Sequence, residues 1–148
     1  MKSKTKERKD TAKLLKLSDA GIGMGVSAID DGLRFARGKA LRDALIHCRK
    51  AHEELESDIS ALLSEMGMGG KKLNPMARIM SFFTIRGRLY LDKSDENISK
   101  LLLKGCEMGI TSLEKELIQR KDASPKAREL VGRLIVCESS LKKALSKG

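Results

Sequence analysis

The sequence predicts an all-α protein, folded as an antiparallel four-helix bundle in a single domain. The first observation is an apolar stripe between Leu41 and Met66, whose members recur at alternating steps of four and three residues. This spacing places side chains on one face of a long helix. Comparable stripes recur in three other segments, and we expect almost no β-structure. A chain of 148 residues is large enough for one apolar core.

The first helix is predicted from Asp10 to Ala36, with Gly38 ending it. The preceding residues 1–9 are polar and rich in lysine, and we expect them to be flexible. Three glycines interrupt this helix, each costing about 1 kcal/mol relative to alanine. They indicate the close approach of a neighbouring helix, a local bend or a binding notch: Gly21, Gly23 and Gly25.

The second helix is predicted from Lys39 to Met66, and Gly67, Gly69 and Gly70 end it. A connector follows from Lys71 to Asp92. It is too long for a tight turn and rich in apolar residues, so we expect a short helix after Asn74-Pro75 that packs across the bundle.

The third helix is predicted from Asp95 to Arg120, with Ser94 as its N-cap. Ser124-Pro125 then supplies an N-cap and a proline in the first turn of a fourth helix, which ends near Ser146. Short linkers make the helices of each hairpin antiparallel neighbours, and the long connector crosses between the two pairs.

The net charge of +10 comes from two basic segments. Residues 1–16 hold seven bases and two acids, whereas residues 67–91 hold five bases and no acid. An anionic partner, either a nucleic acid or an anionic membrane surface, would meet one or both segments. The alternative is that apolar residues of the connector cap the core while its cations point to water. The candidate anion-binding residues of the connector are Lys71, Lys72, Arg78, Arg86 and Arg88.

No segment is apolar enough to span a membrane, and no secretory signal follows the basic start, so we expect a cytoplasmic protein. The three cysteines lie within apolar helical stripes, which favours reduced, packed thiols over disulfides.

His52 lies on the apolar stripe of the second helix, near its middle. One interpretation is a buried histidine bonded to a carboxylate or a carbonyl. The other is a zinc site, because Cys106 and Cys137 fall near the midpoints of their own helices and thiolates with imidazole suit that ion. Glu107 or Glu138 would complete the site. His47, one position from the stripe, is expected at the surface.

Three stretches carry a resemblance to a known superfamily: Ala51-His-Glu-Glu-Leu-Glu-Ser-Asp-Ile with Leu62 to Gly70, Lys104-Gly-Cys-Glu-Met-Gly, and Ala123-Ser-Pro-Lys-Ala-Arg-Glu-Leu. Together with the helix lengths they resemble ferritin-like four-helix bundles, in particular an uncharacterised bacterial branch. The resemblance implies a carboxylate-bridged di-metal site with two Glu-x-x-His motifs. Arg49 stands three residues before His52 in place of an acid, and the fourth helix has no histidine. The di-metal site is therefore degenerate, and di-iron chemistry is disfavoured.

These patterns favour a non-catalytic binding or assembly module over an enzyme. No catalytic group can be assembled, because neither histidine has a neighbouring nucleophile in sequence, and we expect no cofactor. The alternative functions are metal binding through His52 and cysteines, and anionic-surface binding. We expect a homo-oligomer, because the stripes are wide enough to leave further apolar residues exposed: Leu15, Ile22, Ile29, Leu33 and Ile110.

Overall fold

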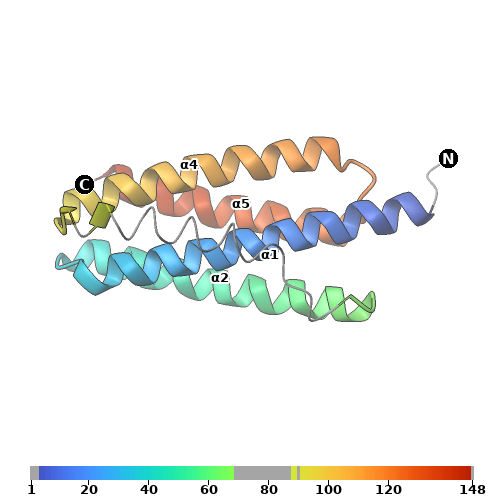
Figure 1. The fold of residues 1–148 in the computed structure, drawn as a ribbon, viewed down its shortest axis with the longest axis horizontal. Coiled ribbons are helices and arrows are strands. Elements are labelled where there is room, and N and C mark those ends of the chain that lie inside the picture. The colour runs from blue at the N-terminus through green and yellow to red at the C-terminus, as the bar shows by residue number, and fades with distance from the viewer. Residues whose placement is uncertain (1–3, 69–87, 90, 148) are drawn as a thin grey trace.

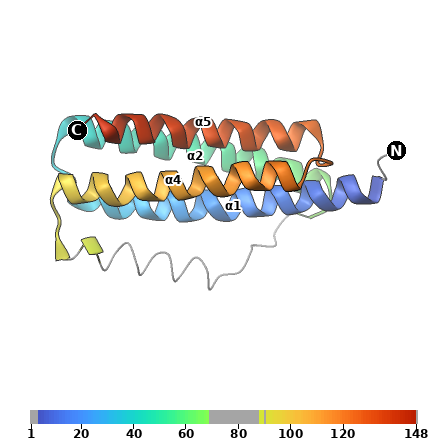
Figure 2. The same ribbon diagram turned by 90° about the horizontal axis from the view of Figure 1, so that it is seen from above.

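The computed structural model describes residues 4–68, 88–89 and 91–147 and forms a bundle of four helices (Figure 1). Their bounds are α1 Lys4–Phe35, α2 Lys39–Glu65, α4 Asp95–Gln119 and α5 Pro125–Ser146. The described ranges contain no strand. Figure 2 shows the bundle from above, with α5 beside α2 and α4 beside α1. The sequence prediction of an all-α four-helix protein is confirmed.

The helix boundaries follow from local capping chemistry. Ser94 accepts a hydrogen bond from the Asn97 N–H at 3.1 Å, and Ser124 accepts one from Ala127 at 3.2 Å. Each bond satisfies a backbone donor that has no partner within its helix. At the end of α2, Gly67 adopts a φ of 72°, a conformation that L side chains rarely adopt, and this fixes the predicted stop.

The N-terminal helix differs from its prediction, because α1 begins at Lys4 and includes residues expected to be flexible. Tertiary contacts hold this first turn. The Arg8 guanidinium donates to the Met66 carbonyl at 2.6 Å, and Lys6 Nζ lies 3.0 Å from Asp122 Oδ2. The sequence pattern could not show these partners, which are more than 50 residues away. The connector helix predicted after Asn74-Pro75 lies outside the described residues.

The chain reverses direction between α1 and α2 and again between α4 and α5 (Figure 1). One arginine stabilises each reversal. Arg42 Nη1 donates to the carbonyls of Leu33 and Ala36, both at 2.8 Å, at the end of α1. Arg128 Nη1 binds the end of α4 in the same way, through the carbonyls of Leu117 and Arg120. Both arginines satisfy helix C-terminal acceptors and complement the negative end of the helix dipole.

Two apolar clusters fill the interior. The first lies between the N-terminal half of α1 and the C-terminal half of α2, with parts of α4 and α5. The second lies at the opposite end, around Leu45, Ile98 and Leu141. Cys137 packs against both clusters. The polar centre described below therefore lies between two apolar layers.

Three of the five apolar residues that were expected to be exposed, and so to favour an oligomer, lie in the core. Leu15 and Ile22 are 0% exposed and Ile29 is 2% exposed, so these three side chains are buried within one chain. Leu33 and Ile110 are partly buried. The buried surface of α1 is broader than a single apolar stripe, because α1 contacts α2, α4 and α5. Oligomerisation stays a prediction that no longer rests on those buried residues.

Candidate metal centre

His52 occupies the middle of the bundle and is 1% exposed. It lies one helical turn after Cys48, which is 4% exposed, so both side chains leave α2 on the same face. That face meets α5, where Cys137 is partly buried. Three potential ligands from two helices therefore converge at one level of the core.

Three donor atoms form a compact triangle. Cys48 Sγ lies 3.7 Å from Cys137 Sγ, and each sulfur lies 3.4 Å from His52 Nδ1. Zinc binds cysteine sulfur at about 2.3 Å and histidine nitrogen at about 2.0–2.1 Å. In a tetrahedral site, two such sulfurs lie about 3.8 Å apart, and a sulfur and a nitrogen lie about 3.5 Å apart. The triangle therefore has the edge lengths of one face of a tetrahedral zinc site.

Glu138 fixes the orientation of the imidazole. Its Oε1 lies 2.9 Å from His52 Nε2, and the carboxylate accepts a hydrogen bond from the Nε2–H group. This leaves Nδ1 directed at the two sulfurs and at the Cys48 carbonyl, 2.9 Å away. A carboxylate on the outer nitrogen of a histidine is the usual support for a metal-binding imidazole, because it fixes the tautomer and raises ligand basicity.

Hydrogen bonds among the three side chains shift their pKa values. The Cys48 thiol donates to Cys137, which lowers the pKa of Cys137, and His52 lowers it further despite burial. The same contact and burial raise the pKa of Cys48. Burial alone would lower the pKa of His52, but its bonds to Cys137 and Glu138 raise it to about 10. The imidazole of His52 therefore contacts a cysteine sulfur at one nitrogen and a carboxyl oxygen at the other, so that its buried polar atoms are hydrogen-bonded.

A glycine on α1 leaves space for this centre. A Cβ at Gly25 of α1 would lie 3.0 Å from His52 Nε2 and 3.8 Å from Glu138 Oε1. On α4, a Cβ at Gly109 would lie 4.0 Å from the Glu138 carboxyl group, an ordinary contact. A Cβ at Gly21 would meet nothing within 4 Å. The prediction of close helix approach therefore holds at Gly25 and fails at Gly21.

The structure brings together some of the candidate ligands and separates others. His52, Cys137 and Glu138 meet as described. Cys106 is buried, and the charge of Glu138 together with burial raises its pKa, but its sulfur lies outside the three-atom group. Glu107 is exposed and does not join the centre. Glu107 follows Cys106 directly, and adjacent positions on a helix point about 100° apart; on α4 this turns Glu107 to the surface while Cys106 is buried.

Cys48 is a candidate ligand that the sequence analysis did not name. It was placed on the apolar stripe as a core residue, yet it lies four residues before His52, a spacing that puts both on one face. Arg49, three residues before His52, points away from the centre and forms ion pairs at the surface. Its guanidinium contacts Asp30 Oδ1 at 2.6 Å and also pairs with Glu53 at the surface. His47 is exposed as predicted.

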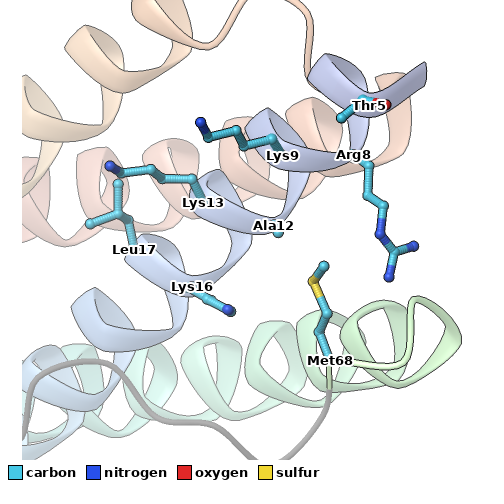
Figure 3. Close-up of a pocket in the computed structure, with 8 residues that line it drawn as sticks. All are labelled: Thr5, Arg8, Lys9, Ala12, Lys13, Lys16, Leu17 and Met68. Atoms are coloured by element: carbon cyan, nitrogen blue, oxygen red, sulfur yellow. The ribbon is translucent and has the colours of Figure 1, made fainter. Parts of the chain in front are cut away.

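A second feature is a groove at the N-terminal end of α1, with a volume of about 430 Å³ (Figure 3). Ala12, Leu17 and Met68 supply apolar lining. Four cations border it: Arg8, Lys9, Lys13 and Lys16. Thr5 completes the described lining, which contains no acid. Of the candidate anion-binding residues of the connector, Arg88 is exposed and the other four lie outside the described ranges.

Searches of protein-family models, curated proteins and solved structures found no match to this chain. None of the described helices is both long enough and apolar enough to span a membrane.

Proposed function

We propose that the protein is a non-catalytic metal-binding helical bundle that holds one zinc(II) ion per chain between α2 and α5. Its ligands are Cys48 Sγ, His52 Nδ1 and Cys137 Sγ. The observation that carries this proposal is the triangle of donor atoms, with edges of 3.7, 3.4 and 3.4 Å. Two thiolates and an imidazole are soft and borderline ligands, which select zinc over magnesium or calcium.

The charges of the ligands also support zinc. Two thiolates balance the charge of the divalent ion, and the Glu138 carboxylate accepts a hydrogen bond from the imidazole Nε2–H. Three protein ligands leave one tetrahedral position for a fourth ligand such as water.

We further propose that the helices have the antiparallel, ferritin-like arrangement. In Figure 1, α2 ends at the opposite end of the bundle from the start of α4, as expected if a long connector joins them. The metal chemistry differs from that of the superfamily, because a cysteine and histidine set replaces the carboxylate-bridged pair of ions.

Elemental analysis of untagged protein tests the metal proposal. We expect one zinc per chain after purification, or after zinc is added to chelator-treated protein and the excess is removed. Cys48→Ser and Cys137→Ser should each lower zinc affinity at least 100-fold, while Cys106→Ser retains full loading. Circular dichroism should show that all three variants keep their helices.

A chain that remains helical but binds no zinc would contradict the proposal. The contacts around His52 would then serve as a hydrogen-bonded polar core. Full loading of the Cys48→Ser and Cys137→Ser variants would equally contradict the assigned ligands.

The basic groove supports a second candidate function, the binding of an anionic partner. Four cations around an apolar floor suit a ligand with a negative group and an apolar part. We expect dodecanoate to bind and dodecyltrimethylammonium not to bind, with affinity falling as salt rises. The double variant Lys9→Glu, Lys13→Glu should abolish binding, whereas Lys39→Glu, Lys126→Glu should not. Equal binding of both amphiphiles would reject this function.

A further inference from the structure

The two sulfur ligands of the proposed metal site lie in direct contact across the interface of α2 and α5. Their separation of 3.7 Å exceeds a disulfide bond by about 1.7 Å. No other group separates the two atoms along this contact, and small side-chain rotations can shorten such a gap. The pair is therefore placed to form a covalent bond when one of the two sulfurs is oxidised.

The two cysteines differ in their access to solvent. Cys48 is 4% exposed, whereas Cys137 is only partly buried. A small oxidant arriving from solvent would therefore meet Cys137 first. Cys48 is then the neighbouring thiol that can react with the oxidised sulfur. Cys106 is buried and its sulfur lies outside the three-atom group, so this cysteine serves as an internal control.

We propose that Cys48 and Cys137 form a dithiol–disulfide couple that is oxidised by hydroperoxides and that releases the metal when the disulfide forms. This inference rests on the proposed zinc site. It adds a redox reaction to a site whose ligands would otherwise only hold an ion.

The reaction balances in two steps. The Cys137 sulfur attacks one oxygen of the hydroperoxide, the O–O bond breaks, and the products are a sulfenic acid and an alcohol, or water when the oxidant is hydrogen peroxide. The Cys48 sulfur then attacks the Cys137 sulfur, forming the S–S bond and releasing water. In the absence of zinc the two thiols lose two electrons and two protons in total, and the hydroperoxide gains them. In the zinc-loaded protein the sulfurs are thiolates, so they supply the two electrons and the two protons come from solvent.

Metal release follows from the loss of ligands. Zinc requires the thiolate form of cysteine, and a disulfide sulfur carries no such charge. After oxidation His52 is the one assigned ligand that remains, still bonded to Glu138. One imidazole holds zinc far more weakly than two thiolates and an imidazole, so the ion dissociates.

The test treats zinc-loaded protein with hydrogen peroxide and follows two readouts. A chromogenic chelator measures released zinc, and peptide mapping under non-reducing conditions identifies the disulfide. We expect one zinc released per disulfide formed, a bond between Cys48 and Cys137, and recovery of zinc binding after treatment with dithiothreitol. Cys106→Ser should behave like the natural chain, and Cys137→Ser should form no intramolecular disulfide.

Three results would overturn the proposal: a disulfide that includes Cys106, zinc release without any disulfide, or thiols that survive excess peroxide. Metal-free protein treated in parallel separates the two claims, since the disulfide should form there as well. If the chain binds no zinc yet joins Cys48 to Cys137, the metal proposal fails and the coupled release fails with it, whereas the thiol pairing holds.

Discussion

A side chain at position 25 would press against the imidazole of His52, because an added Cβ would lie 3.0 Å from Nε2. Gly25→Ala should therefore displace the ring and lower zinc affinity roughly 10-fold or more. The gain in helix propensity, about 1 kcal/mol, should be offset by the strain of a crowded core. Zinc competition titrations and urea unfolding measure the two effects.

Gly21→Ala is the matched control on the same helix. Its Cβ meets nothing within 4 Å, so we expect unchanged zinc affinity and a gain of about 0.5–1 kcal/mol in the free energy of unfolding. Equal zinc affinities in the two variants would show that Gly25 is not needed for the orientation of His52.

Glu138 is expected to act through His52 rather than as a ligand. Glu138→Ala removes the acceptor 2.9 Å from Nε2 and should lower zinc affinity about 10–100-fold while the sulfur ligands remain. The Co(II)-loaded variant should keep its thiolate charge-transfer absorption. Glu107→Ala, at an exposed acid on α4, is the control and should change nothing. A similar loss in both variants would point to a general effect of charge.

Part of the centre could be predicted from the sequence. Helix midpoints placed His52, Cys137 and Glu138 at one level, because rise per residue is fixed. The same reasoning also made Cys106 and Glu107 candidates, because the position of a residue along the helix axis does not show which face of α4 it lies on. Cys48 was missed as a ligand, although its spacing from His52 could have identified it.

Capping residues and glycines in the sequence predict both ends of α2, α4 and α5 to within about one residue. Ser94 and the Ser124-Pro125 pair define helix starts through their own hydrogen bonds and backbone restrictions. The start of α1 was misplaced by six residues, because partners distant in sequence hold its first turns. Such contacts leave no periodic pattern in the sequence.

The arginines that bind helix ends should matter for the stability of each hairpin. Arg42→Met keeps much of the apolar stem but removes two donors to the carbonyls of Leu33 and Ala36. We expect the free energy of unfolding to fall by about 1–2 kcal/mol, because charged donors at a partly buried site are lost. Urea unfolding with Lys50→Met as an exposed control on α2 checks this. Equal stabilities would show that these bonds contribute nothing.

Asp95 links the start of α4 to the turn between α1 and α2. Its carboxylate accepts the Arg37 and Gly38 N–H groups at 2.8 and 2.7 Å, and these bonds lower its pKa below 3.8. A group with a lowered folded pKa stabilises the fold above its unfolded pKa and loses that contribution as pH falls. Stability should therefore decline below about pH 4, and Asp95→Asn should flatten this decline. An unchanged pH profile in the variant would contradict the assignment.

At the scale of the whole molecule, the proposed ligands come from different hairpins. Cys48 and His52 belong to the hairpin of α1 and α2, and Cys137 belongs to that of α4 and α5. An ion bound there would join the two hairpins at the level between the two apolar clusters. The fold class was predictable from apolar periodicity, whereas the pairing of helices across the bundle was not, because periodicity does not specify neighbours.

X-ray absorption of the zinc-loaded protein tests the central claim most directly, since it reports the ligands of the ion. We expect two sulfur neighbours at about 2.3 Å and a histidine nitrogen at about 2.0–2.1 Å, with one sulfur lost in the Cys137→Ser variant. A zinc shell made of nitrogen and oxygen alone would contradict it.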